Sequence, residues 1–140
     1  MRHMHRWIIG ALAAVLGSAT AASAVPARMV SQPAEPMNFE GTSGGTVASD
    51  CGNISAQPSQ QIQLTDEFTQ SSGYLRFVVE GAGDPTLLIE GPAGRFCVLS
   101  DRAMDKGPEA VGYWLPGTYN IYVGDREAQS HPYNLSISAE

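Results

Sequence analysis

The residues of this sequence best suited to chemistry are three aspartates whose carboxylate oxygens could bind a hard cation. Asp84 precedes the apolar run 86–90, and Asp101 follows the apolar run 95–100. Pairing of the two runs across a turn would bring both carboxylates to one end of a sheet, and Asp105 lies in the next loop. Because Ca²⁺ binds several oxygen ligands, Asp84, Asp101 and Asp105 are the candidate ligands of a calcium site. The alternative is an acidic loop that is simply solvated.

Catalytic groups are harder to find. His131 lies beside Ser130 in the segment 129–132, and neighbouring loop residues rarely reach the geometry of a nucleophile and its base. The sequence contains no Gly-x-Ser-x-Gly motif. Asp66 and Glu67 are adjacent, so on an extended chain their carboxylates point to opposite sides and cannot flank one bond. We therefore expect an exposed turn residue at His131, a solvated strand end at Asp66 and Glu67, and a protein that is not an enzyme.

Aromatic side chains offer a second kind of binding chemistry, because an exposed ring can stack on a sugar or a peptide. Alternation along the segment 118–124 points Tyr122 outward, and the pair Tyr113–Trp114 must place one ring outside. The candidate ligand contacts are Tyr122 and Trp114. Single exposed aromatics are also normal on protein surfaces, so the alternative is that neither ring binds anything.

Cys51 and Cys97 are the only cysteines of the sequence. In an oxidising compartment, an even pair in a small domain forms a disulfide more often than a metal site or a reactive thiol. Two thiolates cannot complete a four-ligand zinc site. We therefore predict a Cys51–Cys97 disulfide, which in the chain-entropy model stabilises the fold by about 4 kcal/mol.

The start of the chain has the three parts of a secretory signal peptide. The basic start MRHMHR is followed by the apolar stretch WIIGALAAVLG and by a small-residue tail that ends at Ala24. The apolar stretch has 11 residues, fewer than the roughly 17 to 25 that a spanning helix needs. We predict that residues 1–24 are a cleaved signal peptide, that no membrane span remains after cleavage, and that the protein is secreted or periplasmic.

The charge of the chain bears on its partners. The 140 residues carry a formal net charge of -6, and cleavage after Ala24 would remove Arg2 and Arg6 and bring it to -8. Phosphate binding needs clustered Lys and Arg, and the whole chain holds only eight of them. We therefore expect no nucleic-acid partner.

The elements that must position these residues are short strands. Residues 25–50 are rich in Pro, Gly, Ser, Thr and Ala, which predicts a linker or loosely ordered arm. Beyond it, apolar and polar residues alternate in segments separated by turn residues, a pattern typical of a sandwich or small barrel. The predicted strands lie in 61–65, 74–80, 86–90, 95–100, 118–124 and 132–138. We predict an all-β fold, an antiparallel, jelly-roll-like β-sandwich over 51–140 or from near residue 39.

Two of these predicted strands differ from the others. The runs 86–90 and 95–100 are more continuously apolar than the others, so we expect either that both of their faces are covered or that they lie in the middle of a sheet. Gly91-Pro92-Ala93-Gly94 joins them, which predicts a hairpin.

Several short motifs follow one another in a characteristic order along the chain. They are Asp84 to Leu87, Gly91 to Gly94, Ser100-Asp101, Leu115 to Tyr119, and Tyr133 to Ile137. This order resembles the pre-peptidase C-terminal (PPC) domain family, small secreted β-sandwich modules found beside bacterial proteases, and the likeness covers roughly residues 39–139. The resemblance implies a protease-accessory role, with calcium binding in some members. Here almost the whole exported chain would be the module, a departure from the family pattern.

These observations favour a secreted or periplasmic, non-catalytic β-sandwich module that binds protein or polysaccharide at the cell surface. The alternative is a structural envelope protein that assembles through a sheet edge or another part of its surface. An exposed aromatic or acidic concavity beside Asp101 would favour ligand binding. A long, uncharged edge strand would favour assembly.

Overall fold

The computed structural model describes residues 25–30 and 36–140. The predicted signal peptide, residues 1–24, lies outside this part of the chain. Among the described residues, no helix has both the length and the apolar character needed to cross a bilayer.

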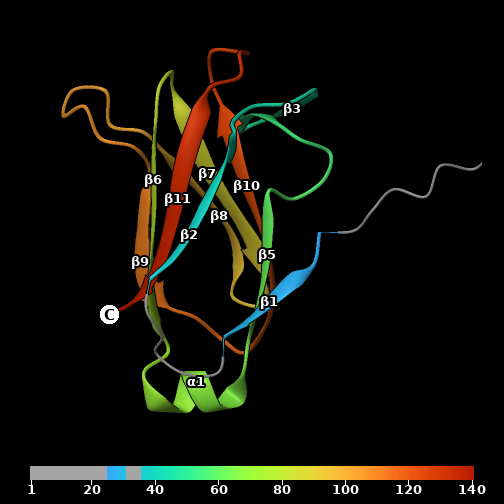
Figure 1. Ribbon diagram of the computed structural model, residues 1–140, viewed down its shortest axis with the longest axis vertical. Coiled ribbons are helices and arrows are strands. Elements are labelled where there is room, and N and C mark those ends of the chain that lie inside the picture. The colour runs from blue at the N-terminus through green and yellow to red at the C-terminus, as the bar shows by residue number, and fades with distance from the viewer. Residues whose placement is uncertain (1–24, 31–35) are drawn as a thin grey trace, which may run out of the picture.

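Two β-sheets form the fold (Figure 1). Sheet A consists of β1 (Ala27–Val30), β3 (Val47–Ser49), β4 (Gly52–Ile54), β5 (Gln60–Leu64), β7 (Pro85–Gly91), β8 (Gly94–Leu99) and β10 (Gly117–Asp125). Sheet B consists of β2 (Met37–Thr42), β6 (Tyr74–Gly81), β9 (Glu109–Tyr113) and β11 (Pro132–Ala139). The order is β1-β5-β10-β7-β8 in sheet A, with β4 and β3 continuing from the end of β10, and β2-β11-β6-β9 in sheet B. The prediction of an all-β sandwich is confirmed.

The core lies between the two sheets, because alternate residues of each strand point inward. Phe77 and Val79 of sheet B face Ile62, Tyr119 and Ile121 of sheet A, and all of these side chains are fully buried. Each of the six predicted strands is present, and β7 and β8 form the predicted hairpin with Gly91 paired to Gly94. Pairing is antiparallel throughout except between β1 and β5, which are parallel.

The described residues of the segment 25–50 do not form the linker that the composition predicted, and the alternative start of the domain near residue 39 is closer to what the structure has. They supply β1, β2 and β3, and Met37 and Phe39 of β2 pack against the core. β2 pairs with β11 along its whole length, with Phe39 opposite Leu135. The sandwich therefore begins before residue 51. The strands of this segment are short edge strands, which need only a few inward apolar side chains. Small and turn-forming residues fill the other positions, so the sequence shows no clear alternation of apolar and polar residues.

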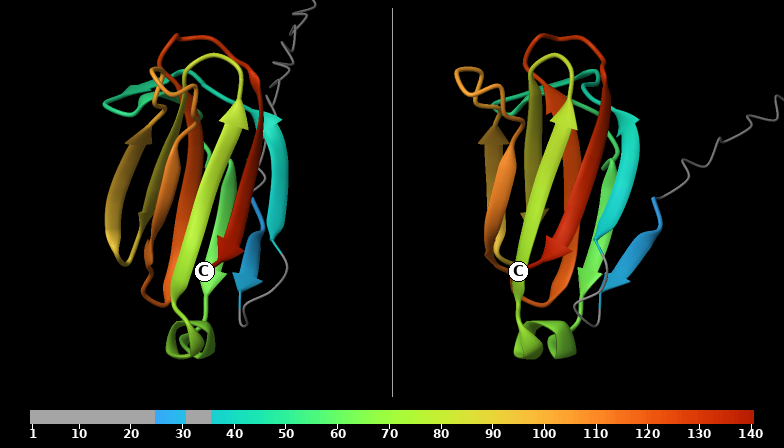
Figure 2. Two further views of the ribbon diagram at one scale, coloured as in Figure 1. Left: turned by 90° about the vertical axis from the view of Figure 1, so that its left-hand side faces the viewer. Right: turned by 60° about the vertical axis from the view of Figure 1, so that its left-hand side comes forward.

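A short helix, α1 (Asp66–Ser71), closes one end of the sandwich (Figure 2). Thr65 caps it by accepting a hydrogen bond from the backbone N–H of Phe68 at 3.2 Å, and the Phe68 side chain is fully buried. Asp66 and Glu67 occupy the first turn, where carboxylates interact favourably with the helix dipole. Both residues are solvent-exposed, as expected, but they begin a helix and do not end a strand.

The two long edges of the sandwich differ. On one edge lie β1 of sheet A and β2 of sheet B, and Arg28 lies over the ring of Phe39. On the other edge, β8 pairs only with β7 and β9 only with β6 among the described strands. β8 is mostly exposed and lies at the edge of its sheet, so the expectation that this run is covered on both faces or lies mid-sheet was wrong. We call the β8–β9 side the open edge.

Candidate functional site

Four loops meet at the end of the sandwich opposite α1, which we call the loop end (Figures 1 and 2). Asp84, in the loop before β7, is 3% exposed. Arg126 contacts its carboxylate with Nε at 2.7 Å from Oδ2 and Nη2 at 2.8 Å from Oδ1. Arg102 Nη2 lies 3.0 Å from Oδ2, and the Ser100 hydroxyl donates a hydrogen bond to Oδ1.

These contacts keep Asp84 ionised. Burial on its own raises the pKa of this carboxyl group. The hydrogen bonds from Arg126 and Ser100 and the positive charges of Arg126 and Arg102 outweigh burial, so the pKa of Asp84 lies below its ordinary value. The carboxylate is thus a fixed negative charge that holds two loops together.

Asp125 is the second buried carboxylate of the loop end and is fully buried. Its Oδ2 lies 2.8 Å from Nδ1 of His131 and accepts a hydrogen bond from the Ser43 hydroxyl at 3.3 Å. The Ser43 oxygen accepts from the backbone N–H of His131, not from its ring. Ser43 is 2% exposed, so this Asp–His–Ser group connects the β10–β11 loop to the end of β2 and does not present a nucleophile. The side chain of His131 is only 21% exposed, and its ring is paired with the Asp125 carboxylate. The expectation of an exposed turn residue was therefore wrong.

The predicted calcium ligands share the loop end but not one centre. Asp84 and Asp101 do flank the same end of the β7–β8 hairpin, as the sequence suggested. Asp101, however, is exposed and accepts hydrogen bonds from the backbone N–H groups of Ala103 and Met104. Asp105 is exposed, with φ at 51°. Calcium binding there stays a prediction, and the ion would have to displace two guanidinium groups from Asp84.

Another group of potential metal ligands lies nearby. One ligand atom from each of Asp125, Glu127 and His131 lies within 4.8 Å of the others. Each ligand atom already has a protein partner: Asp125 and His131 contact one another, and Glu127 lies 2.7 Å from Arg102. The geometry is that of a closed polar network that fixes the loops.

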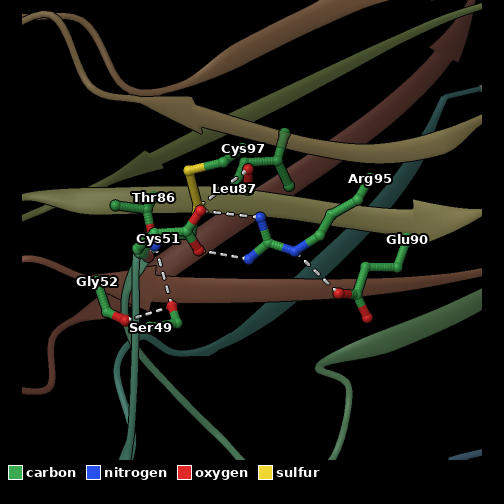
Figure 3. Close-up of a disulfide and its surroundings, with 9 residues drawn as sticks. Ser49, Cys51, Gly52, Thr86, Leu87, Glu90, Arg95 and Cys97 are labelled. Atoms are coloured by element: carbon green, nitrogen blue, oxygen red, sulfur yellow. Dashed lines mark hydrogen bonds and ion pairs between the residues drawn. A yellow bond between two sulfur atoms is a disulfide. The ribbon is translucent and has the colours of Figure 1, made fainter.

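The predicted disulfide is present and crosses the outer face of sheet A (Figure 3). It links Cys51, in the turn between β3 and β4, to Cys97 on β8. Cys51, Ile54 and Leu88 form a small apolar cluster beneath it, and Tyr122 packs against this cluster. Tyr122 is therefore half-buried, and burial, followed by the charge of Glu90, raises the pKa of its hydroxyl.

Polar contacts reinforce this bridge. Thr86, which is fully buried, donates its hydroxyl to the Cys51 carbonyl at 2.6 Å. Arg95 of β8 makes a two-pronged contact with Asp50, with nitrogen to oxygen distances of 2.6 and 3.1 Å, and contacts Glu90 at 3.2 Å. The β3–β4 hairpin is thus fastened to β8 by a covalent bond and an ion pair (Figure 3).

Trp114 does not face outward, so its assignment as a surface contact was wrong. It is 5% exposed and stands edge-on to the rings of Phe77, Phe96 and Tyr119, at centroid distances of 5.0 to 5.4 Å. The other member of the pair, Tyr113, is the one that faces outward and is 49% exposed. Trp114 follows the end of β9 and turns into the core at that point.

The open edge holds an apolar concavity that sequence reasoning missed. Its volume is about 160 Å³, and it lies between β8 and β9. We call it the edge groove; its lining residues are Phe96, Val98, Ala110, Val111, Gly112, Tyr113 and Trp114. No charged side chain lines it. The continuous apolar character of 95–100 was the signal in the sequence, but it was read as a mark of burial.

The outer face of sheet B beside the edge groove exposes several apolar side chains, next to the ion pair of Arg76 and Glu109. Val111 is 54% exposed, and Tyr74 and Tyr113 are about half exposed, with their rings 5.6 Å apart at an interplanar angle of 69°. Exposed apolar surface that gathers at one place marks an interaction site more often than scattered single residues do.

Comparison with known proteins gives a family but no activity. No family model matches the chain, so membership of the PPC family is not confirmed. The crystal structure of PliG from Aeromonas hydrophila, a periplasmic inhibitor of g-type lysozyme, aligns with 82% of this chain and 100% of its own, at a TM-score of 0.44 and 14% identity. A likeness this remote supports no inference about function. An uncharacterized protein of Synechococcus elongatus is 48% identical over 132 residues, which cover 94% of this chain and 95% of that protein. The chain therefore belongs to the same family as this Synechococcus elongatus protein.

Proposed function

We propose that the chain is an exported, non-catalytic β-sandwich module that binds another protein at its open edge. The observation that carries this proposal is the edge groove, an uncharged concavity of about 160 Å³ bordered by two edge strands. Natural proteins protect sheet edges with charges, prolines or covering segments. Here β8 and β9 each carry one charged residue, Arg95 and Glu109, near the start of the strand, and the stretches 96–99 and 110–113 that follow carry no charge and no proline.

Export is supported by the signal-peptide pattern of residues 1–24 and by the disulfide between Cys51 and Cys97. A non-catalytic role is supported by the loop end. There the buried carboxylates of Asp84 and Asp125 are held in ion pairs and hydrogen bonds within the fold. The protease-accessory role implied by the PPC resemblance is one form that this function could take.

A protein partner suits the open edge better than a polysaccharide. Sugars bind to flat aromatic platforms, whereas the rings of Tyr74 and Tyr113 stand at 69° to one another. A protein segment can use both the apolar groove and the backbone groups of an edge strand.

Site-specific photocrosslinking in the exporting cell tests this function. A photoreactive phenylalanine analogue replaces Phe96 in the edge groove, and in a control variant it replaces Tyr122 on the outer face of sheet A. We expect one protein to be crosslinked from position 96 but not from position 122. That protein, once purified, should bind the parent and bind the Val111→Lys variant at least about tenfold more weakly, because a charge at an apolar contact is costly. No crosslink from position 96, or equal crosslinks from both positions, would contradict the proposal.

The second candidate function is assembly of copies of this chain through the same edge. It is favoured by the uncharged stretch 110–113 of β9. Concentration-dependent dimerisation that Val111→Lys abolishes would support it over a separate partner.

A further inference from the structure

Gly112, at the open edge, has no structural reason within the chain to be glycine. Every other glycine that the structure describes either has a φ in the left-handed region or lies where a Cβ would come within 3.0 Å of another atom. At Gly112, a Cβ would meet nothing within 4 Å, and its φ is not positive. Glycine in a strand is less stable than alanine by about 0.5 to 1 kcal/mol. An exposed strand glycine without an internal cause often marks a place where another chain approaches closely.

The position of Gly112 connects it to the edge groove. Along β9, Ala110 and Gly112 face inward, opposite Phe77 and Leu75 of β6, and Val111 faces outward. The inward-facing positions of β9 therefore offer the groove only a methyl group and a bare Cα, and Val111 and Tyr113 line it from the outward-facing positions of the same strand. Phe96, which faces inward from β8, remains 39% exposed because nothing on β9 covers it.

The size of the groove limits what can enter it. A cavity of about 150 Å³ is large enough for a benzene ring, and the groove measures about 160 Å³. One aromatic or branched aliphatic side chain would fill it. Because no charged residue lines the groove, the entering side chain must also be uncharged.

A second copy of this chain does not fit these requirements. If β9 paired with β9 of another copy about Val111, Gly112 would face Ala110 of that copy. Neither residue has a side chain that could fill the groove. Each copy also carries a formal net charge of -6, or -8 after the predicted cleavage, which opposes self-association and favours a partner of positive net charge.

We propose that the edge groove receives an extended segment of a different, basic protein, which adds as a strand alongside β9 and inserts one large apolar side chain over Gly112. This inference rests on the proposed function and specifies how the partner would bind. Backbone hydrogen bonds to an edge strand supply affinity, and the groove selects the inserted side chain. Gly112 keeps the entrance open at a small cost in strand stability.

The test begins with 12-residue random peptides displayed on phage and selected on the purified protein. An enriched peptide is synthesised, and its dissociation constant is measured for the parent and for Gly112→Leu, whose side chain would occupy the groove. We expect binding to weaken at least about tenfold, the loss that follows when one apolar side chain leaves its pocket. Replacing the large apolar residue of the peptide with alanine should produce a similar loss.

Two further variants guard against misfolding and non-specific effects. Gly112→Ala should melt at or above the parent temperature, because a Cβ fits there, yet bind the peptide more weakly. Asn38→Leu, on the edge strand β2 at the far side of sheet B, should bind like the parent.

The possible outcomes separate this inference from the proposed function. If no peptide is enriched, or if Gly112→Leu and Gly112→Ala bind like the parent, the strand-addition mode is wrong. A partner that is still crosslinked from position 96 would then leave the proposed function standing. If position 96 also yields no partner, both fail.

Discussion

The charged residues of the loop end illustrate how buried carboxylates can serve structure instead of chemistry. Asp84 lies in the loop before β7 and Asp125 is the last residue of β10, and each is surrounded by donors from other segments: Arg126 and Ser100 for Asp84, and His131 for Asp125. Buried carboxylates are costly unless they are paired and hydrogen-bonded. Each is satisfied here within the described chain, so the loops are fixed with respect to one another.

At this scale, the Asp84→Asn variant is predicted to change the pH dependence of stability. Folding lowers the pKa of Asp84, so its ion pairs stabilise the fold above the ordinary pKa of about 4, and this contribution is lost as pH falls through the folded-state pKa. Removing one partner of a buried pair costs about 3 kcal/mol. Urea unfolding should show that Asp84→Asn is less stable than the parent by about this amount at pH 7, with a smaller difference at pH 3.

The exposed Asp105 provides the control for that variant. Asp105→Asn should change the free energy of unfolding by less than about 0.5 kcal/mol at either pH, because surface substitutions usually have small effects. An Asp84→Asn deficit that is equally large at both pH values would show that the lost stability does not come from ionised Asp84.

Some residue positions could be predicted and others could not. The position of Asp84 and Asp101 at the same end of the β7–β8 hairpin could be predicted, because the turn fixes which residues of the two strands face one another. The choice between Tyr113 and Trp114 was wrong because alternation holds only within a strand, and Trp114 lies past the end of β9. The contact between His131 and Asp125 joins loop residues six positions apart, and no periodic pattern indicates it.

At the scale of elements, the hairpin β7–β8 shows why an apolar run is ambiguous. Residues 86–90 and 95–100 look alike in the sequence, yet β7 lies between β10 and β8, and β8 lies at the open edge. β7 is buried on both faces, as its composition predicts. The core buries the apolar residues of β8 to a smaller extent than those of β7. The presence of apolar residues on β8 is what the proposed binding of a partner strand explains.

The disulfide leads to a prediction at the same scale. Cys51 and Cys97 are separated by 46 positions, and the bridge fastens the β3–β4 hairpin over Leu88. Replacing both cysteines with alanine should lower the free energy of unfolding by about 4 kcal/mol. Backbone amides of β3 and β4 should lose protection from hydrogen exchange before those of sheet B, because sheet B makes no contact with the bridge.

The reduced protein provides an independent check. A reducing agent should lower the melting temperature of the parent but leave that of the double alanine variant unchanged. A parent melting temperature that is insensitive to full reduction would show that the bridge contributes little.

At the scale of the whole molecule, the sandwich is closed on three sides and open on one. α1 closes one end, the loop network closes the other, and β1 and β2 lie at one long edge, where Arg28 contacts the ring of Phe39 (Figure 2). The all-β sandwich could be predicted because inward residues recur every second position in several segments. The closing segments could not, because short edge strands and a six-residue helix leave weak periodic signals.

The most direct test of the account is to map where a bound partner protects the backbone. Amide hydrogen exchange would be measured residue by residue, with and without the protein crosslinked from position 96 or the selected peptide. We predict that binding slows exchange in β9 and β8, around Gly112 and Phe96, and leaves the loop end unchanged. Protection confined to the loop end around Asp84, or to the outer face around Tyr122, would contradict the claim that the open edge is the binding site.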